Sequence, residues 1–243
     1  MQPITLYQFP ISHYCEKVRW ALDYKGVPHQ IKNLLPGKHI EFAKSVAQRS
    51  SVPILQVGDT YVQQSSAIID YLDEHFPDKP LTPADPDLRE EALKWEAFAD
   101  KDLGPHVRRW AYYTLLEHPS VVLPALTTGA PLLFKPMFRL FFPKVRALMK
   151  KAMNIYPDEA QASAVQIDVA LAQIDEALNG KDFLVGDTFS RADLAVSAML
   201  APLFMPKQYG VKWPKKMPEP LQGWVSARQD KLVWAEKVYG ENR

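Results

Sequence analysis

The first 26 residues change from one hydrophobic pattern to another. Ile4 to Phe9 is a run of β-branched and aromatic residues, which favours a strand, and Pro10 ends it because proline cannot donate a hydrogen bond to a sheet. After Ser12 the apolar residues recur at helical spacing, with charged residues between them. Ser12 occupies the position of a helix N-cap, and Gly26 is a good C-terminal stop. The pattern therefore predicts a strand, a tight loop and a helix.

The pattern of the next 50 residues is weaker but still alternates between strand and helix. Gly58-Asp59 is a favourable two-residue turn for a hairpin. The predicted order up to residue 76 is βαβαββα. The expected elements are a strand over 28–34, a short helix or ordered loop over 38–48, a hairpin over 52–57 and 61–63, and a helix over 65–76 capped by Ser65 or Ser66.

A proline-rich stretch separates this region from the rest of the chain. Residues 77–87 hold four prolines and three aspartates, which suit neither a long helix nor a central strand. We therefore expect an α/β domain over residues 1–78, a linker over 79–87 and an all-helical domain over 88–243.

Helical spacing dominates the second domain. Ser190 and Asp193 form a variant capping box, with Asp in place of the usual Glu or Gln, and we expect them and Asp187 to have structural roles. Five prolines between residues 118 and 157 are expected to break any long helix there. The predicted helices cover 88–117 with a kink at Gly104-Pro105, 158–178, 190–204 and 221–239.

Composition excludes several classes of protein. The net charge of +1 indicates no general affinity for nucleic acid. One cysteine excludes an internal disulfide and suits a reducing compartment, so we expect a cytoplasmic protein. The N-terminus carries no pattern of a secretory signal, and the longest uncharged run is too short and too rich in proline to span a membrane.

Three sequence blocks together resemble the cytosolic glutathione transferases, in particular serine-type, bacterial-like members. Ser12 stands where a thioredoxin-like domain has the first cysteine of a CxxC motif. The resemblance implies a thioredoxin-like domain and a helical domain, a homodimer, and attack of the glutathione thiolate on an apolar electrophile. It implies no metal or other cofactor. The remaining blocks are Val52-Pro53-Ile54-Leu55 with Gly58-Asp59 and Gln64-Ser65-Ser66-Ala67-Ile68-Ile69, and Phe183 to Leu194.

Ser12 is the candidate catalytic residue. Lowering the pKa of a thiol from ~8.5 by about two units requires roughly 2.7 kcal/mol. A hydroxyl bonded to the thiolate contributes ~1.5–3 kcal/mol and a helix N-terminus ~0.3–1 kcal/mol, and Ser12 could supply both. Tyr7 is the rival hydroxyl. Aligning Phe9-Pro10 and Cys15 with the family pattern places Gln8, not Tyr7, at the tyrosine position of other members. Strand alternation then turns the Tyr7 side chain to the other face of the sheet.

Two neighbours of Ser12 leave alternatives open. Cys15 lacks a partner cysteine, so it is either a small buried packing residue or a site for a mixed disulfide with glutathione. His13 departs from the proline common in this loop, and is either a solvated loop residue or a substrate contact.

The resemblance also assigns residues to glutathione binding. Val52-Pro53 matches the family's cis-proline turn, which lets the Val52 backbone pair with the cysteinyl unit. Gln64 and Ser65 match the acid–serine pair that holds the γ-glutamyl end, although Gln64 loses the usual charge. For the glycine carboxylate, Lys38, His39 and Arg49 remain equal candidates.

The segment from 118 to 157 contains no acidic residue but six Lys and Arg residues and many Leu and Phe residues. It is either core with a solvated basic face, a wall of the electrophile site through Phe138 and Phe141, or a basic helix that contacts membranes. The prolines argue against membrane contact.

Two other functions remain possible on this fold. One is a non-catalytic protein that binds apolar ligands, and the other is a glutathione-dependent reductase or lyase. The reductases usually have Cys at the position of Ser12, which argues against that activity.

Overall fold

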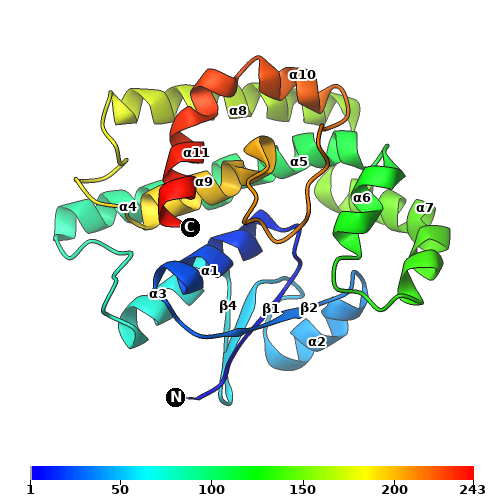
Figure 1. Cartoon of the computed structure of the whole chain (residues 1–243), viewed down its shortest axis with the longest axis horizontal. Coiled ribbons are helices and arrows are strands. Elements are labelled where there is room, and N and C mark those ends of the chain that lie inside the picture. The colour runs from blue at the N-terminus through cyan, green and yellow to red at the C-terminus, as the bar shows by residue number, and fades with distance from the viewer. Residues whose placement is uncertain (1) are drawn as a thin grey trace.

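The computed structural model describes residues 2–243 and has an α/β layer below a larger group of helices (Figure 1). The α/β part confirms the predicted order βαβαββα. Its elements are β1 (Ile4–Gln8), α1 (His13–Tyr24), β2 (Gln30–Asn33), α2 (Lys38–Val46), β3 (Ile54–Val57), β4 (Thr60–Gln63) and α3 (Ser65–His75).

The four strands form one mixed sheet in the order β2-β1-β3-β4. β1 is parallel to β2 and antiparallel to β3, with Leu6 opposite Ile31 on one side and Leu55 on the other. β3 and β4 form the predicted hairpin, whose turn is Gly58-Asp59. Because β1 lies between β2 and β3, the loop that follows β1 begins at the middle of one end of the sheet.

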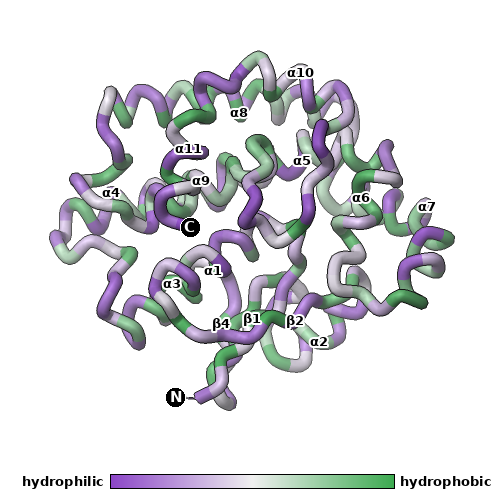
Figure 2. The backbone as a smooth tube through the Cα atoms, viewed as in Figure 1, coloured by the Kyte–Doolittle hydropathy of each residue, from purple (hydrophilic) through white to green (hydrophobic). Residues whose placement is uncertain are grey.

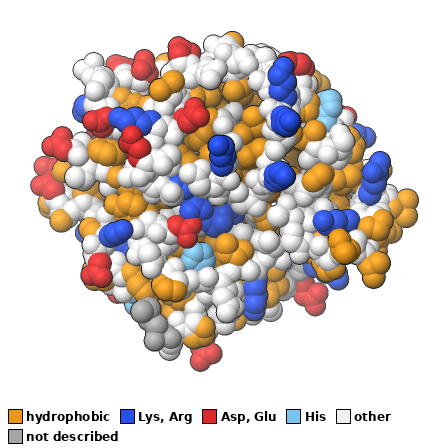
Figure 3. Space-filling model, viewed as in Figure 1, with side chains coloured by type: hydrophobic (Ala, Val, Ile, Leu, Met, Phe, Trp, Pro, Cys, Tyr) orange, Lys and Arg blue, Asp and Glu red, His pale blue; other side chains and the backbone are white. Residues whose placement is uncertain are grey.

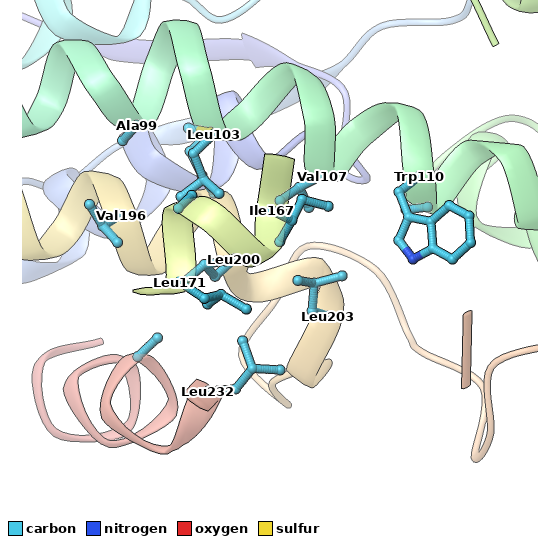
Figure 4. Close-up of a cluster of buried hydrophobic side chains, with 14 of the residues drawn as sticks. Ala99, Leu103, Val107, Trp110, Ile167, Leu171, Val196, Leu200, Leu203 and Leu232 are labelled. Carbon is cyan, nitrogen blue, oxygen red and sulfur yellow. The ribbon is translucent and has the colours of Figure 1, made fainter. Parts of the chain in front are cut away.

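The rest of the chain is helical, so the predicted fold class is confirmed. Every residue of α9 except the last is buried, and Figure 2 shows α9 mostly white and green where the outer helix α8 alternates with purple. Figure 4 shows apolar side chains of neighbouring helices, among them Leu103, Ile167 and Leu232, meeting those of α9. The helices are α4 (Pro86–Phe98), η1 (Ala99–Leu103), α5 (Gly104–Leu115), α6 (Pro119–Leu126), α7 (Phe134–Met153), α8 (Pro157–Leu178), α9 (Arg191–Phe204), α10 (Leu221–Ser226) and α11 (Gln229–Asn242).

Several helix boundaries differ from the expectation. The helix predicted over 88–117 is continuous but widens into a π-helical turn, η1, just before Gly104-Pro105. A wider turn of this kind accommodates Pro105, which has no N–H to donate within the helix. The helix expected over 221–239 is two helices, α10 and α11. The N-cap of α3 is Gln64, not Ser65 or Ser66.

The prediction that prolines break every long helix between 118 and 157 is wrong. α7 runs for 20 residues with Pro136 in its first turn and Pro143 inside it. Pro136 removes an amide that has no partner in a first turn anyway. Pro143 is exposed, so water can bond the carbonyl that loses its helical donor. α7 is therefore one long amphipathic helix.

Buried charges join the two parts of the chain. The carboxylate of Glu96 in α4 lies 2.8 Å from the ammonium of Lys17 in α1, and its other oxygen accepts a 2.8 Å hydrogen bond from Nε of Arg191 in α9. Arg191 also donates to Asp70 of α3 at 2.6 Å. These contacts fix α1 and α3 against the helical domain, and the predicted capping box of Ser190 and Asp193 is confirmed.

The C-terminal end of the chain lies against α1 (Figure 1). Tyr239 donates a 2.5 Å hydrogen bond to buried Glu16, and Arg243 lies 2.8 Å from the same carboxylate. No helix within residues 2–243 is long and apolar enough to cross a membrane.

Candidate active site

A cavity of about 670 Å³ lies between the α/β domain and the helical domain. The loop from Phe9 to Tyr14 borders one side together with residues of the α2 region and Val52. The opposite side consists of α5, α6 and α7. The cavity therefore opens directly above the N-terminus of α1, the place where the sequence predicts thiol chemistry.

Ser12 is the N-cap of α1 and lines this cavity. Its Oγ accepts a hydrogen bond from the Cys15 amide at 3.4 Å, which leaves the hydroxyl proton free for another acceptor. The carbonyl of Ser12 accepts from Glu16 N–H, and its own amide donates to Phe9, so the loop backbone is held on both sides. A thiolate placed here would meet a hydroxyl donor at the positive end of a helix.

His13 also lines the cavity, but it is buried, so the expectation of a solvated loop residue is wrong. Burial, and secondarily the nearby Arg108 cation, lowers the pKa of His13 to about 3, which makes it neutral at physiological pH. Its ring lies edge-on to Tyr14 with 4.6 Å between centroids. His13 is the first residue of α1, and it is 4% exposed.

Cys15 is completely buried and does not line the cavity. Burial raises the pKa of its thiol, so the neutral form is favoured. This environment supports the packing interpretation of Cys15 over a mixed disulfide.

Tyr7 lies on the other face of the sheet, as predicted. It donates to Gln56 at 2.9 Å and stacks on Phe42 of α2. Ser12 is therefore the hydroxyl of the two that faces the cavity.

The predicted glutathione residues follow the edge of the sheet nearest the cavity. The Val52-Pro53 peptide is cis, and Val52 lines the cavity just before β3 begins. Gln64 and Ser65 do not line the cavity but follow β4 directly. Gln64 has φ 82°, ψ 136°, a conformation that costs a non-glycine residue on the order of 1–3 kcal/mol and is typical of ligand sites.

The first turn of α3 has no side-chain cap, so its amides are available to a carboxylate. Ser65 is buried at the first position of this helix. Its role in binding glutathione remains a prediction.

Of the three candidates for the glycine carboxylate, only His39 lines the cavity. Its Nδ1 lies 3.1 Å from the amide of Gly37, an arrangement in which Nδ1 accepts and Nε2 carries the proton. Burial lowers the pKa of His39, so it would act as a neutral donor. Lys38 and Arg49 are exposed and do not border the cavity.

Comparison with known families agrees with this geometry. The family model described as "Glutathione S-transferase, N-terminal domain" matches residues 6–80, and "Glutathione S-transferase, C-terminal domain" matches residues 131–227. The chain belongs to the glutathione S-transferase family. The two matches contain the thioredoxin-like sheet and most of the helical domain.

Relatives of this glutathione S-transferase family member differ in their reported activities. Glutathione S-transferase 1 of Dianthus caryophyllus is 40% identical to the chain over 100 residues, and the matched part covers 40% of this chain and 44% of the relative. A maleylpyruvate isomerase of Ralstonia sp. is 36% identical over 105 residues, covering 42% and 50%. The chain thus spans about half the length of the curated relatives it matches.

A solved structure matches over nearly the whole length. The beta-etherase LigF from Sphingobium sp. strain SYK-6 has a TM-score of 0.63 at 21% identity, covering 98% of this chain and 99% of that chain. At this identity the likeness shows the fold alone.

The residues that form the helical wall of the cavity differ from those that the sequence predicts. Phe138 and Phe141 do not line it: Phe138 is buried in the helical core, and Phe141 is half exposed. The C-terminal half of α7 lines the cavity instead. The lining residues that the sequence did not reveal include Arg108, Tyr112, Val145, Leu148, Met149 and Trp213.

One feature of the sequence could have pointed to Arg108. It lies one helical turn before Tyr112, on the stripe of α5 that also carries Ala111 and Leu115. A cation on an otherwise apolar helix face is unusual and indicates a special environment.

Proposed function

We propose that this protein is a glutathione transferase that joins the glutathione thiolate to an apolar electrophile, with Ser12 as the thiol activator. The observation that carries the proposal is the position of the Ser12 hydroxyl, at the N-terminus of α1 and on the wall of the cavity, with its proton uncommitted. Glutathione would extend along the cis Val52-Pro53 turn toward Gln64 and Ser65. The apolar electrophile would occupy the space bordered by α5, α6 and α7.

In this reaction Ser12 would donate its hydroxyl hydrogen bond to the sulfur and so favour the thiolate. The thiolate would then attack the electrophilic carbon, and the leaving group would depart with the bonding electrons. His13, which is neutral here, also presents a buried Nε2 atom without a hydrogen-bond partner, so it is a second polar group beside the Ser12 hydroxyl at this end of the cavity. The mostly apolar lining would exclude water from the reacting atoms.

The names of the relatives make isomerisation and ether cleavage the main alternatives. Both reaction types also begin with attack by glutathione, so Ser12 would keep its role and only the later steps would differ. A reductase is disfavoured because Cys15 is buried and has no partner cysteine. A binding protein without activity would share the cavity but not the dependence on Ser12.

Four assays on the purified protein separate these functions. The first follows conjugation of glutathione to an aryl halide, the second follows thiol–disulfide exchange, the third follows cis–trans isomerisation of a maleyl ketone, and the fourth follows glutathione-dependent cleavage of an aryl ether. We expect turnover in the first assay and none in the second. Turnover only in the third assay would identify an isomerase, and no turnover in any assay would favour a binding protein.

Changes at the start of α3 should alter glutathione affinity. Ser65→Ala is expected to raise the Kd for glutathione about 10- to 150-fold, because a hydrogen bond to a charged group contributes ~1.5–3 kcal/mol. Gln64→Glu is expected to lower the Kd a few-fold by placing a charge opposite the γ-glutamyl amine. Titration calorimetry measures both, with Ser66→Ala as the control in the same turn. Unchanged affinity in both variants would remove this pair from the site.

The proposal includes a homodimer in the cytoplasm, as the resemblance implies. Light scattering should then give about twice the chain mass of 27.7 kDa.

A further inference from the structure

The cavity has an unusual distribution of charge. Its lining within residues 2–243 contains no aspartate or glutamate, and its two histidines, His13 and His39, both have lowered pKa values. Arg108 is the one Lys or Arg side chain in this lining. An apolar cavity thus contains a single permanent cation.

Nothing in the described chain neutralises Arg108. None of the ion pairs found within residues 2–243 includes it. Its Nε is buried and has no hydrogen-bond partner. The neighbouring arginine, Arg109, by contrast, donates to Met153 and Ser163. A buried donor without a partner is costly, so its retention next to a cavity points to an external acceptor.

Arg108 approaches the cavity at the position of the predicted chemistry. It projects from α5 near the residues that follow Ser12, and its charge acts on His13, Tyr14 and Tyr112. His39, the candidate for the glycine end of glutathione, belongs instead to α2, on the α/β side of the cavity. Arg108 is therefore placed to meet the second substrate rather than the far end of glutathione.

We propose that the electrophile of this enzyme carries an anionic group, a carboxylate or a sulfonate, that binds the guanidinium of Arg108. This inference rests on the proposed function and specifies its substrate class. The planar guanidinium bonds such a group through two N–H donors at once, and the dry lining strengthens the pair. The apolar side chains of α7 then hold the uncharged body of the substrate.

A matched pair of aryl halides tests the inference. 4-Chloro-3,5-dinitrobenzoate and 2-chloro-1,3-dinitrobenzene differ only in the carboxylate opposite the chlorine. In both, the thiolate forms a C–S bond at the carbon that bears chlorine, the C–Cl bond breaks, chloride leaves with the electron pair, and the thiol proton passes to solvent. Once each rate is divided by the uncatalysed rate with glutathione, the remaining difference and the difference in KM report recognition of the carboxylate.

We expect the wild-type protein to have the lower KM for the benzoate. Arg108→Met, which keeps an unbranched apolar stem but removes the guanidinium, should raise that KM about 10- to 100-fold, while the KM values for the neutral halide and for glutathione change far less. Arg108→Lys should recover part of the loss. Lys101→Met, which removes one exposed cation near the start of α5, should change neither KM.

Two results would overturn the inference while leaving the proposed function standing. One is an equal KM for both halides in the wild-type protein. The other is an increase in the KM for glutathione, or for both halides equally, in Arg108→Met, which would place Arg108 at glutathione. If neither halide reacts, the proposed function fails, and binding of the benzoate is read from quenching of tryptophan fluorescence, since Trp213 lines the cavity. Equal quenching in wild-type protein and Arg108→Met would then reject the anion site.

A different observation concerns the outer end of the helical domain. Five large apolar side chains project into solvent at the start of α7, and we call them the α7 patch. Figure 3 shows orange hydrophobic atoms mixed with blue Lys and Arg atoms at the right edge, where Figure 1 places α7. The α7 patch consists of Leu132 (82% exposed), Leu133 (89%), Met137 (49%), Leu140 (76%) and Phe141 (49%).

The charge around the α7 patch has one sign. Lys135, Arg139 and Lys144 are exposed within it, and residues 118–157 contain no acidic residue. The cations further along, Arg146 and Lys150, already pair with Glu117. Large exposed apolar side chains beside unpaired cations are typical of helices that lie in the interface of an anionic bilayer.

We infer that the α7 patch rests on an anionic lipid surface. The objection from the sequence no longer holds, because α7 is continuous through Pro143. A second copy of the chain fits less well: a twofold interface would set the patch against itself and bring its cations together. Leu148, further along α7, both lines the cavity and is 67% exposed, so the surface continues to the cavity mouth.

Vesicle sedimentation tests this inference. We expect the protein to sediment with vesicles of about three parts phosphatidylcholine to one part phosphatidylglycerol, less so at high salt, and not with phosphatidylcholine alone. Leu132→Asp with Leu133→Asp should weaken binding at least about tenfold without affecting the fold, since both side chains are almost fully exposed. Val233→Asp, an exposed apolar position on α11, is the matched control and should bind like the wild type.

Wild-type protein that stays in solution with the anionic vesicles would overturn the inference. So would equal sedimentation of the double variant. Self-association beyond the dimer that the double variant abolishes, without vesicle binding, would assign the α7 patch to a second copy instead.

Discussion

Replacing Ser12 with alanine is expected to slow conjugation about 10- to 100-fold at neutral pH. The loss of the hydroxyl removes a hydrogen bond to the thiolate, so the pKa of the thiol of bound glutathione should rise by roughly one or two units. The apparent pKa of the pH–rate profile should rise by the same amount. The deficit should therefore shrink as the pH approaches the new pKa, and a spectroscopic titration of the thiolate measures the shift directly.

Two controls separate this effect from loss of a helix cap. Ser12→Ala also removes the N-cap of α1, which costs about 1 kcal/mol of stability. Asp85→Ala removes the N-cap of α4, far along the chain from Ser12, and should lower stability similarly without changing the pKa of the thiol. Cys15→Ala should keep most of the activity. If Cys15→Ala abolishes turnover and Ser12→Ala does not, the assignment of Ser12 is wrong.

Replacing Glu96 with glutamine is expected to have the largest effect on stability. Glu96 is 2% exposed and contacts Lys17 and Arg191, which are equally buried. Removing its charge takes one carboxylate from two buried cations, and breaking a buried pair in this way costs up to about 3–5 kcal/mol. Lys17 keeps its ion pair with Asp100, and Arg191 keeps its ion pair with Asp70. The midpoint of thermal unfolding should fall by roughly 6–20 °C for a chain of this size.

The control for Glu96 lies on the same helix. Glu90 pairs with Lys94 at 2.6 Å, but both side chains are largely exposed. Glu90→Gln should therefore leave the unfolding midpoint unchanged within error. Equal midpoints for the Glu90 and Glu96 variants would show that the buried network does not hold the domains together.

Many elements of the fold could be predicted because their causes are local. The strand that ends at Pro10, the Gly58-Asp59 turn and the capping box of Ser190 and Asp193 each depend on residues within a few positions of one another. The same holds for Ser12, which caps the helix that directly follows it. Propensity, turn chemistry and capping act over this range, so the pattern of the chain contains the information.

The sequence-based predictions were wrong where the surroundings of a residue in the folded chain outweighed its local preference. The prolines of α7 did not break the helix, because one lies in the first turn and the other faces water. The cap of α3 was misplaced because Gln64 adopts a positive φ that propensity does not anticipate. Of the two alternatives for His13, the solvated loop residue is wrong, because the side chain is buried on the wall of the cavity.

The amino-acid sequence by itself determined the family, the order of elements, and the hydroxyl at the start of α1. Only the tertiary structure decided which residues share the cavity with that hydroxyl. Arg108 and Ser12 are far apart in the chain, and Glu96 joins Lys17 to Arg191 across most of its length. Whether a side chain is buried, paired or left without a partner depends on segments that meet only after folding, and no local pattern records which segments those are.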